Sequence, residues 1–477
     1  MVSSLLHSLV YFLQYGVLPY CIFTLTGYAL MTIRSVKVLK KHKEANINID
    51  YKTLNQSPFL PSISIIAPAY NEGVTIVENI RSLLSLGYNN LKIIVVNDGS
   101  KDDTLEKAIK FYNLEVAEYY FKYRLPCNNI RAVYKSRNKA FKNLIVVDKA
   151  NGGKADALNA GLNISYSDYF ACVDVDCLIE PNAFENMILP VLNNPKEVVA
   201  VGGIVWLNND SVIKHGHMIK LQVPGSFLPT VQLLEYFRAF LLGRTAWGSI
   251  NGLMLISGAF GIFHREYVIK VGGYNKKTVG EDMELVMRLH KYMLSNKIPY
   301  QVAYVPHPFC WTEAPESLKI LSRQRNRWAR GTAECLLLHK DMLFNPKYGV
   351  IGMISYPYWL IAEWMGPFIE GLGLLFTLIM IVMGMINWHV FAIMSFFIFS
   401  ISVFFSISAI LVQEIYIGKY SNPKDLMKMF LTAIAEPFIY HPMTVYWAIK
   451  GNYDLFFKKT HSWGEMTRTG FNKSVVK

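Results

Sequence analysis

Long apolar segments stand at both ends of the chain. Residues from Leu9 to Ile33 are almost uncharged and long enough to span a bilayer. A basic cluster follows at once, so the positive-inside rule places the N-terminus outside and the next residues in the cytoplasm. A cleaved signal peptide is the alternative, but the basic cluster lies on the wrong side for one and no small-residue cleavage site stands out. We expect an uncleaved anchor over residues 1–36 and a cytoplasmic linker over 37–60.

A second apolar block runs from Tyr348 to Gln413 and is interrupted near residues 384–389. This pattern predicts two crossings joined by a very short loop. A third stretch, 429–449, contains Glu436 and two prolines, so we expect it to be re-entrant, interfacial or kinked. Three crossings in all, within a C-terminal region over 346–450 and before a basic cytoplasmic tail over 451–477, predict a multi-pass protein of the cell membrane. Glu363 and Glu370 either pack at a helix end in the interface or line a polar route through the membrane.

Between residues 61 and 345 short β-branched runs alternate with helical patterns. Strands are predicted at 62–68, 91–97, 144–148 and 169–174, and helices at 74–86, from 102 onward and at 154–162. This order predicts an α/β domain with a Rossmann-like, doubly wound and mostly parallel sheet. Ligands of such sheets bind beyond the carboxyl ends of the strands. No GxGxxG motif follows the first strand, which argues against a dinucleotide oxidoreductase.

The composition and the net charge limit the classes of binding partner. The 477 residues are 52% hydrophobic and carry a formal net charge of +13. Lysines and arginines mostly flank apolar segments, which favours anionic lipid headgroups over nucleic acid as the reason for this charge. The six cysteines show no CxxC spacing, so we expect no structural zinc, and their scatter fits a reducing cytosol.

Acidic residues follow two of the predicted strands. Asp174 and Asp176 stand two positions apart at a strand end, where both carboxylates project the same way and could hold Mg²⁺ or Mn²⁺ shared with a diphosphate. Asp98 could accept hydrogen bonds from a base edge or a ribose. A turn or helix cap is the alternative interpretation at both places. Asn151-Gly152-Gly153-Lys154 opens a helix, so its backbone N–H groups and one ammonium could meet a phosphate, or it is a simple capping loop.

Two helical clusters complete the candidate chemistry. Glu281 and Asp282 begin a helical pattern and serve either as a cap or as the general base that deprotonates an acceptor hydroxyl. Gln324, Arg327 and Trp328 share one helical face. Arg327 could stabilise a leaving diphosphate and Trp328 could stack on a sugar ring. An amphipathic helix lying on the membrane is the other interpretation of this segment, and the two are compatible.

Taken in order, these motifs resemble the processive family-2 glycosyltransferases, the membrane synthases of cellulose, chitin, hyaluronan and poly-N-acetylglucosamine. The motifs are Pro68-Ala69-Tyr70-Asn71-Glu72, Asn97-Asp98-Gly99-Ser100, Gly152-Gly153-Lys154, Asp174-Val175-Asp176, Glu281-Asp282 and Gln324-x-x-Arg327-Trp328. The resemblance implies a GT-A fold with α-helical transmembrane segments, inversion of configuration, a nucleotide sugar donor and Mg²⁺ or Mn²⁺. It implies nucleotide-side roles for Ala67, Tyr70, Glu72, Asp98, Lys154 and Asp174, a metal site of Asp176 with Asp174, and a catalytic set of Asp282, Glu281, Gln324, Arg327 and Trp328.

The sequence departs from the family pattern at two positions. Gly280 stands where cellulose synthases carry threonine, and Asn97 replaces a frequent aspartate. We also expect no C-terminal regulatory domain. The single N-terminal span and the short basic tail resemble bacterial poly-N-acetylglucosamine-type synthases, so UDP-GlcNAc is the favoured donor.

Three hypotheses follow. The first is an inverting enzyme that elongates and exports a polysaccharide, with a growing glycan as acceptor, the lipid bilayer as partner, and an accessory subunit or a homo-oligomer completing the channel. The second is a non-processive enzyme that glycosylates a lipid-linked acceptor. A synthase of another polymer is a variant of the first, and an inactive scaffold or transporter subunit is the third.

Overall fold

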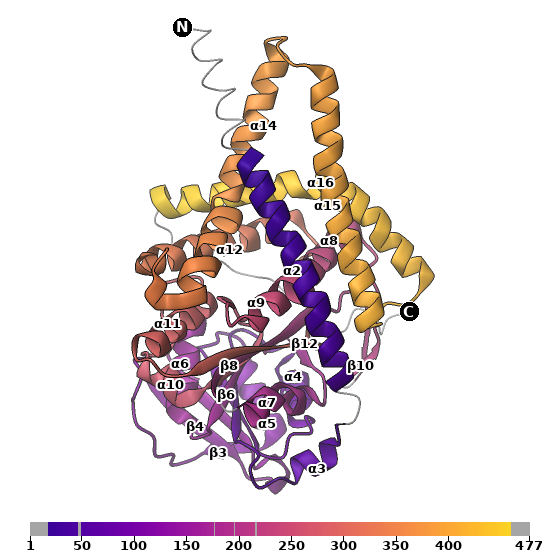
Figure 1. Ribbon diagram of the computed structural model, residues 1–477. Helices are drawn as coiled ribbons and strands as arrows, with labels where there is room; N and C mark the ends of the chain where they lie inside the picture. The colour runs from indigo at the N-terminus through magenta and orange to yellow at the C-terminus, as the bar shows by residue number, and fades with distance from the viewer. Residues whose placement is uncertain (1–17, 46–48, 176, 195, 215–216, 459–477) are drawn as a thin grey trace.

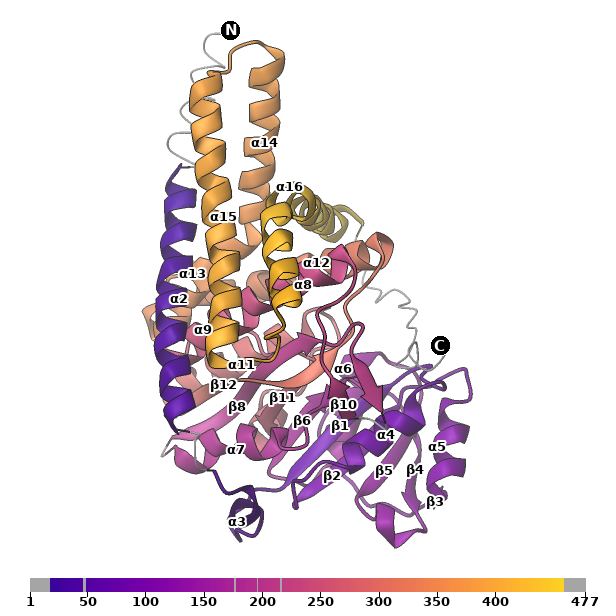
Figure 2. The ribbon, with the colours of Figure 1, turned by 90° about the vertical axis from the view of Figure 1, so that its right-hand side faces the viewer.

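The computed structural model describes residues 18–45, 49–175, 177–194, 196–214 and 217–458. An α/β region forms the lower part of the molecule, and a hairpin of two long helices projects from its upper side (Figures 1 and 2). The predicted α/β fold with a mostly parallel sheet and added transmembrane-type helices is confirmed.

A ten-stranded mixed sheet organises the α/β region, in the order β3-β4-β5-β2-β1-β6-β11-β8-β12-β7. Strands β3, β5, β2, β1, β6, β8 and β12 run one way and β4, β11 and β7 the other. The strands are β1 Ile63–Ala69, β2 Leu91–Asn97, β3 Leu114–Val116, β4 Ile130–Ser136, β5 Leu144–Lys149, β6 Tyr169–Val173, β7 Leu178–Ile179, β8 Glu197–Leu207, β11 Phe260–His264 and β12 Tyr300–Thr312, with a separate hairpin of β9 Val212–Lys214 and β10 His217–Lys220.

Helices cover both faces of this sheet. Alternate residues of β1 belong to different cores, Ile65 to one and Ile66 to the other, and both are fully buried. Burial on both faces explains why the central strands are apolar at nearly every position. The helices of this region are α3 Tyr51–Asn55, α4 Ile76–Leu84, α5 Thr104–Tyr112, η2 Lys139–Phe141, α6 Lys154–Ile164, α7 Ala183–Asn193, α8 Phe227–Tyr236, η3 Phe237–Arg244, α9 Thr245–Ser249, α10 Arg265–Lys270, α11 Glu281–Ser295, α12 Leu318–Leu338, η4 Lys340–Met342 and η5 Pro346–Tyr348.

Three of the described helical segments are long and apolar enough to cross a membrane: Pro19–Glu44, Ile351–Val382 and Trp388–Tyr416. Their number equals the three crossings expected from the sequence, although residues 9–17 of the expected first span lie outside the described part. The first belongs to α2 Leu18–Ala45, the second comprises η6 Ile351–Ser355, α13 Tyr356–Tyr358, η7 Trp359–Trp364 and α14 Gly366–Val382, and the third is α15 Trp388–Tyr416. Helices α14 and α15 form the projecting hairpin, and α2 lies along α15 (Figure 2).

The last long helix, α16 Pro423–Tyr453, lies across the base of the hairpin rather than along it (Figure 1). It packs on α12 and contains Pro437 and Pro442 in its interior. Interior prolines remove backbone hydrogen bonds and bend helices. The helix is not among the candidate spans, which agrees with the interfacial or kinked segment expected here. A short π-helical turn, η8 Asp454–Lys458, follows it.

Candidate functional site

One cavity of about 2830 Å³ joins the sheet edge to the membrane-type helices. It begins beyond the carboxyl ends of β1, β2 and β6 and continues between α2, α14, α15 and α16. Ten of the residues singled out from the sequence line it: Tyr70, Glu72, Asp98, Lys154, Asp174, Glu281, Asp282, Gln324, Arg327 and Trp328. The fold therefore gathers motifs from six separate parts of the chain around one space.

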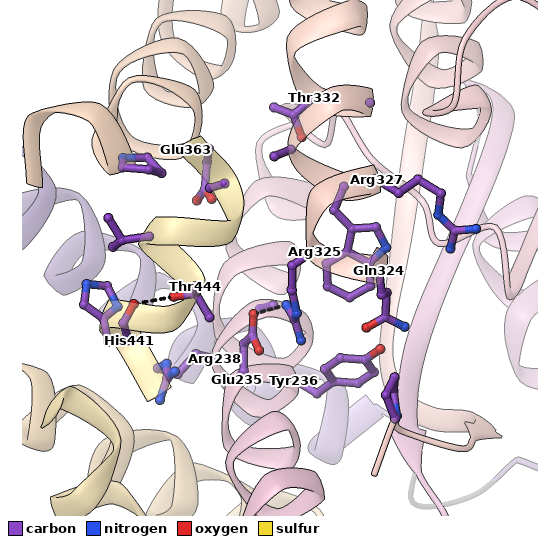
Figure 3. A pocket seen from close by; sticks show the side chains of 18 of the residues that line it. Glu235, Tyr236, Arg238, Gln324, Arg325, Arg327, Thr332, Glu363, His441 and Thr444 are labelled. Carbon is purple, nitrogen blue, oxygen red and sulfur yellow. Dashed lines mark hydrogen bonds and ion pairs between the residues drawn. The ribbon is translucent and has the colours of Figure 1, made fainter. Parts of the chain in front are cut away.

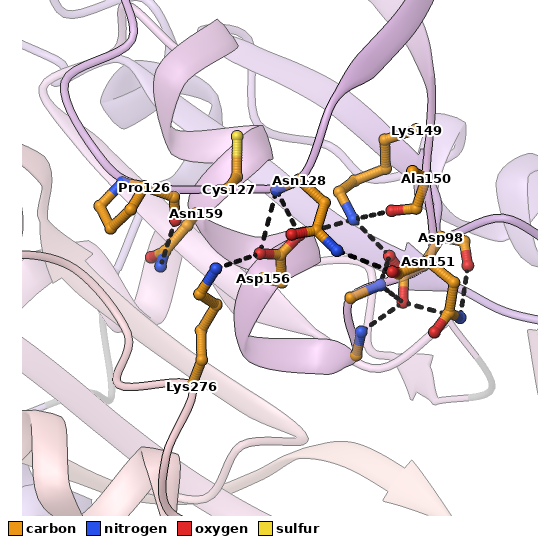
Figure 4. Close-up of polar contacts among 12 residues, drawn as sticks. Asp98, Pro126, Cys127, Asn128, Lys149, Ala150, Asn151, Asp156, Asn159 and Lys276 are labelled. Carbon is orange, nitrogen blue, oxygen red and sulfur yellow. Dashed lines mark hydrogen bonds and ion pairs between the residues drawn. The ribbon is translucent and has the colours of Figure 1, made fainter.

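Asp98, at the end of β2, is a buried acceptor of protein hydrogen bonds (Figure 4). Its carboxylate accepts from Lys149 Nζ at 2.5 Å, from Gly153 N at 2.7 Å and from Gly152 N at 3.0 Å. The backbone N–H groups expected to face a phosphate thus point at Asp98 instead. Asp98 fixes the loop that begins α6, and this structural role accounts for its burial.

Lys149 extends that contact into an ionic chain. Its side chain is 0% exposed and lies 2.6 Å from Asp156 Oδ1 as well as beside Asp98. Asp156 is also buried and pairs with Lys276 Nζ at 2.8 Å (Figure 4). The chain Asp98–Lys149–Asp156–Lys276 therefore connects the end of β2 to the loop that precedes α11.

Gly258 brings the two sides of the site together. Its N–H donates to Asp282 Oδ2 at 3.0 Å, and its carbonyl accepts from Lys154 Nζ at 3.1 Å. A Cβ at this position would lie 3.2 Å from Lys154 Nζ and 3.4 Å from Asp282 Oδ2. A glycine lets the ammonium and the carboxylate approach the same backbone segment.

Asp174 stands at the end of β6 and forms an ion pair with Lys154 at 2.5 Å. Burial alone would lower the pKa of Lys154, but the Asp174 carboxylate and the further negative groups around it raise the pKa above its ordinary value. Lys154 is therefore a fixed positive charge at the sheet edge, as expected for a group that meets a diphosphate.

A divalent cation fits this edge as a shared site. Asp174 lines the cavity with a partly exposed carboxylate, and Mg²⁺ is commonly held by one or two carboxylates together with substrate phosphates. The described residues contain no cluster of three or more His, Cys, Asp or Glu suited to a metal. Asp176, the other predicted ligand, lies outside the described residues.

Helix α11 begins at Glu281, as the sequence predicted, and Asp282 follows in its first turn. Besides the Gly258 contact, Asp282 Oδ1 accepts from Met283 N at 2.8 Å, so both carboxylate oxygens are held in place. Glu281 is buried, and this burial together with the Asp282 charge raises the pKa of Glu281 to about 7. The two neighbouring carboxyl groups both line the cavity but differ in burial, because Glu281 is buried and Asp282 is half-buried.

The QxxRW residues lie on α12. Gln324 Oε1 is buried and has no hydrogen-bond partner among the described residues. The Trp328 ring is 39% exposed, and the Arg325 guanidinium stacks over it at 4.3 Å from the ring centre. Arg325 also pairs with Glu235 Oε1 at 2.5 Å (Figure 3). Arg325 was not predicted, although a second arginine inside the motif is a visible sequence signal.

Ala67 does not reach the cavity. It is 0% exposed within β1, in register with Val95, and its neighbours Pro68 and Ala69 line the cavity instead. Ser257, Gly258, Ala259 and Val205 also line the cavity, whereas Val201 and Ile204 are fully buried.

Two protein-family models match this chain and identify its family. Residues 64–271 match the model "Glycosyl transferase family 2", and residues 171–409, half of the chain, match "Glycosyl transferase family group 2". The chain belongs to the family-2 glycosyltransferases.

This glycosyltransferase is similar to synthases from two Staphylococcus species. It is 31% identical over 302 residues to poly-β-1,6-N-acetyl-D-glucosamine synthase of Staphylococcus aureus strain COL and 30% identical to the synthase of the same name from Staphylococcus epidermidis. The aligned part covers 62% of this chain and 58% and 60% of those proteins. The chain is thus matched to somewhat more than half the length of these relatives.

A solved structure supports the fold. The mannosyltransferase of Pyrobaculum calidifontis in complex with GDP-Man and Mn²⁺ covers 90% of this chain, with a TM-score of 0.50 and 15% sequence identity. At that identity the likeness concerns the architecture alone. It agrees with the sheet and the helices described above.

The membrane side of the cavity in this glycosyltransferase carries three polar clusters. Arg325, Glu235 and Tyr440 form one, with the Tyr440 hydroxyl 3.0 Å from Glu235 Oε2. The second joins Arg238, Glu436 and Ser406. In the third, Glu370 accepts from the Tyr20 hydroxyl at 2.9 Å and contacts His441 Nε2 at 2.8 Å. Glu363 and Glu370, noted from the sequence, both line the cavity.

Proposed function

We propose that this glycosyltransferase transfers N-acetylglucosamine from UDP-GlcNAc, with inversion, to a growing polysaccharide that leaves through the membrane. One observation supports it above all: the cavity lined by Asp174, Asp282 and Arg327 continues without a break between the membrane-type helices. A product formed at Asp282 would already stand at the entrance of that passage. In this proposal the catalytic side faces the cytoplasm and the N-terminus lies outside.

Asp282 would act as the general base. Its carboxylate is oriented by Gly258 N–H and Met283 N–H and borders the cavity, so it can take the proton of an acceptor hydroxyl. The hydroxyl would then attack the anomeric carbon from the side opposite the nucleotide. That direction of attack inverts the configuration.

Lys154 and Arg327 would stabilise the negative charge of the departing UDP. Lys154 stands at the sheet edge beside Asp174, and Arg327 lies on the cavity-facing side of α12. Fixed positive groups aimed at developing charge lower the barrier of such a step. A Mg²⁺ or Mn²⁺ ion held by Asp174 and Asp176 would supply further charge neutralisation at the diphosphate.

The names of the relatives support N-acetylglucosamine as the donor sugar. Both staphylococcal proteins are named for a polymer of N-acetylglucosamine, and each is aligned with this chain over 302 residues. The growing glycan is then the acceptor, and an accessory subunit or a second copy of the chain would complete the passage between the few described membrane-type helices.

A lipid-linked acceptor is the second candidate. It is favoured by the apolar lining contributed by α14 and α15, among them Leu374, Leu378 and Phe397, which could admit an acyl chain. In that case the enzyme would add one sugar and release the product into the bilayer.

The donor that is used and the size of the product distinguish polysaccharide elongation from glycosylation of a lipid-linked acceptor. We would measure UDP release by the full-length protein, reconstituted in lipid vesicles with Mn²⁺, from UDP-GlcNAc, UDP-Glc and UDP-GlcA, separately and in pairs. High-molecular-weight product from UDP-GlcNAc alone is expected. Turnover that yields a single sugar on lipid would favour the second candidate, and absence of turnover with every donor would contradict both.

A further inference from the structure

Two π-helical segments carry charged residues that line the cavity. Segment η3 ends at Arg244, and η7 contains Glu363. π-Helical turns are rare and occur frequently at functional sites, because they shift side chains out of the α-helical register. These two segments come from distant parts of the chain and meet the same space.

Arg244 forms no ion pair with another residue of the described ranges. Its Nη1 is buried without a hydrogen-bond partner in the described residues, and its guanidinium stacks 3.7 Å from the centre of the Phe240 ring. Burial lowers the pKa of Arg244, and the nearby Tyr304, Asp282, Tyr236 and Glu363 groups do not fully offset this effect. Buried charged groups are normally paired, so an unpaired guanidinium at a cavity wall indicates a ligand.

Glu363 also lines the cavity, but as an exposed residue rather than a buried one. No hydrogen bond or ion pair joins its carboxylate to a residue of the described ranges. Figure 3 shows it across the cavity from Gln324 and Arg327. By contrast, Arg325 and Arg238, which line the same cavity, are paired with Glu235 and Glu436.

The chemistry around this pair points to a neutral polar ligand. Gln324 Oε1 and Trp359 Nε1 are also buried without partners in the described part of the chain, and both residues line the cavity. A guanidinium alone would favour an anion, but the Glu363 carboxylate would repel one. Donors and acceptors together with the Trp328 and Trp359 rings match hydroxyl and acetamido groups.

We propose that Arg244 and Glu363 form a binding subsite for the acceptor saccharide, holding a sugar unit on the membrane side of Asp282. This inference rests on the proposed transfer to a glycan. Arg244 would donate to sugar hydroxyl or carbonyl oxygens, and Glu363 would accept from hydroxyl or amide hydrogens. The pair would keep the chain end in place between additions and would not touch the donor.

The test uses the full-length protein in lipid nanodiscs with UDP and Mn²⁺. Binding of a short β-linked N-acetylglucosamine oligosaccharide is measured by equilibrium dialysis, and UDP binding and UDP-GlcNAc turnover are measured on the same preparations. The variants are Arg244→Met, Arg244→Lys and Glu363→Gln. Matched controls are Arg323→Met and Glu118→Gln, two exposed residues outside the cavity lining.

Removing a hydrogen bond to a charged group should weaken oligosaccharide binding about tenfold or more in Arg244→Met and Glu363→Gln. Arg244→Lys should bind at an intermediate level, and UDP binding should stay within about twofold of the parent protein because the donor is not contacted. Unchanged oligosaccharide binding in these variants, or no binding by the parent, would overturn the subsite. Equal losses of UDP and oligosaccharide binding would also overturn it, since they indicate a structural role.

Failure of the proposed function gives a different result. A parent protein that binds the oligosaccharide but turns over no donor would contradict the proposed activity. Selective loss of oligosaccharide binding in Arg244→Met would still support the subsite in that case.

Discussion

Gly280 and Gly331 lie in direct backbone contact. A Cβ on Gly280 would lie 2.9 Å from the Gly331 carbonyl oxygen, and a Cβ on Gly331 would lie 3.0 Å from the Gly280 Cα. The contact joins the start of α11, which carries Asp282, to α12, which carries the QxxRW residues. Glu334 Oε2 reinforces it by accepting from Thr278 Oγ1 at 2.7 Å and from Val279 N at 2.9 Å. Threonine at position 280, as in cellulose synthases, would require the two helices to move apart.

Gly331→Ala should therefore increase the distance between Asp282, the proposed base, and Arg327 of the QxxRW motif. We expect kcat to fall about tenfold to a hundredfold, because small displacements of catalytic groups have effects of this size. Turnover of UDP-GlcNAc and UDP binding would be measured together. Gly373→Ala serves as control, since a Cβ there meets no atom within 4 Å. Full activity in Gly331→Ala would show that the contact does not set the catalytic distance.

Asp282→Asn should abolish transfer and keep donor binding. Loss of a general base is expected to lower the rate by about a hundredfold or more, whereas the amide retains the shape of the side chain. Sugar transfer and UDP binding are the two measurements. Asp341→Asn, at an exposed ion pair with Lys291, should behave like the parent protein. Normal transfer by Asp282→Asn would contradict the role of Asp282 as general base.

Lys149→Met should destabilise the folded protein. The substitution leaves the buried Asp98 and Asp156 carboxylates without their shared ammonium, and breaking a buried ion pair on one side costs about 3–5 kcal/mol. A lower thermal unfolding midpoint in detergent is expected, together with weaker UDP binding as the 151–153 loop loosens. Lys139→Met, at an exposed lysine, provides the comparison. An unchanged midpoint would mean that the ionic chain contributes little.

The buried Glu281 predicts a dependence of stability on pH. Burial and the Asp282 charge raise the pKa of Glu281 from 4.5 to about 7, so the folded state binds this proton more tightly than the unfolded state does. The resulting stabilisation is complete below 4.5 and is lost as the pH rises through about 7. In Glu281→Gln the thermal unfolding midpoint should change less with pH between 4.5 and about 7 than it does in the parent protein. Equal slopes in the variant and the parent protein would contradict this role.

Removal of divalent cations should stop turnover. Chelation followed by addition of Mn²⁺ or Mg²⁺ tests whether activity returns, and Asp174→Asn should raise the metal concentration needed for half-maximal activity about tenfold or more. Direct Mn²⁺ binding in the presence of UDP, followed by electron paramagnetic resonance, gives a readout independent of catalysis. Full activity after thorough chelation would exclude a metal requirement.

Local patterns in the sequence predicted four of the parallel strands, β1, β2, β5 and β6. The strand over 91–97 has the predicted bounds, α6 begins at Lys154 and α11 at Glu281, because apolar runs and helix-start residues report directly on local structure. The other strands of the large sheet, β3, β4, β7, β8, β11 and β12, were not predicted. Their pairing depends on partners distant in sequence, and β7 spans only Leu178–Ile179.

The sequence by itself determined which residues gather at the site, since the motifs follow strands whose carboxyl ends meet at one sheet edge. Only the tertiary structure decided which charges are paired. It placed Lys149 between two buried aspartates, directed Asp98 toward the protein backbone and left Arg244 Nη1 buried without a hydrogen-bond partner in the described residues. The reason is physical: helix and strand formation follow from neighbouring residues, whereas the pairing of a charge depends on burial and on partners far away in the chain.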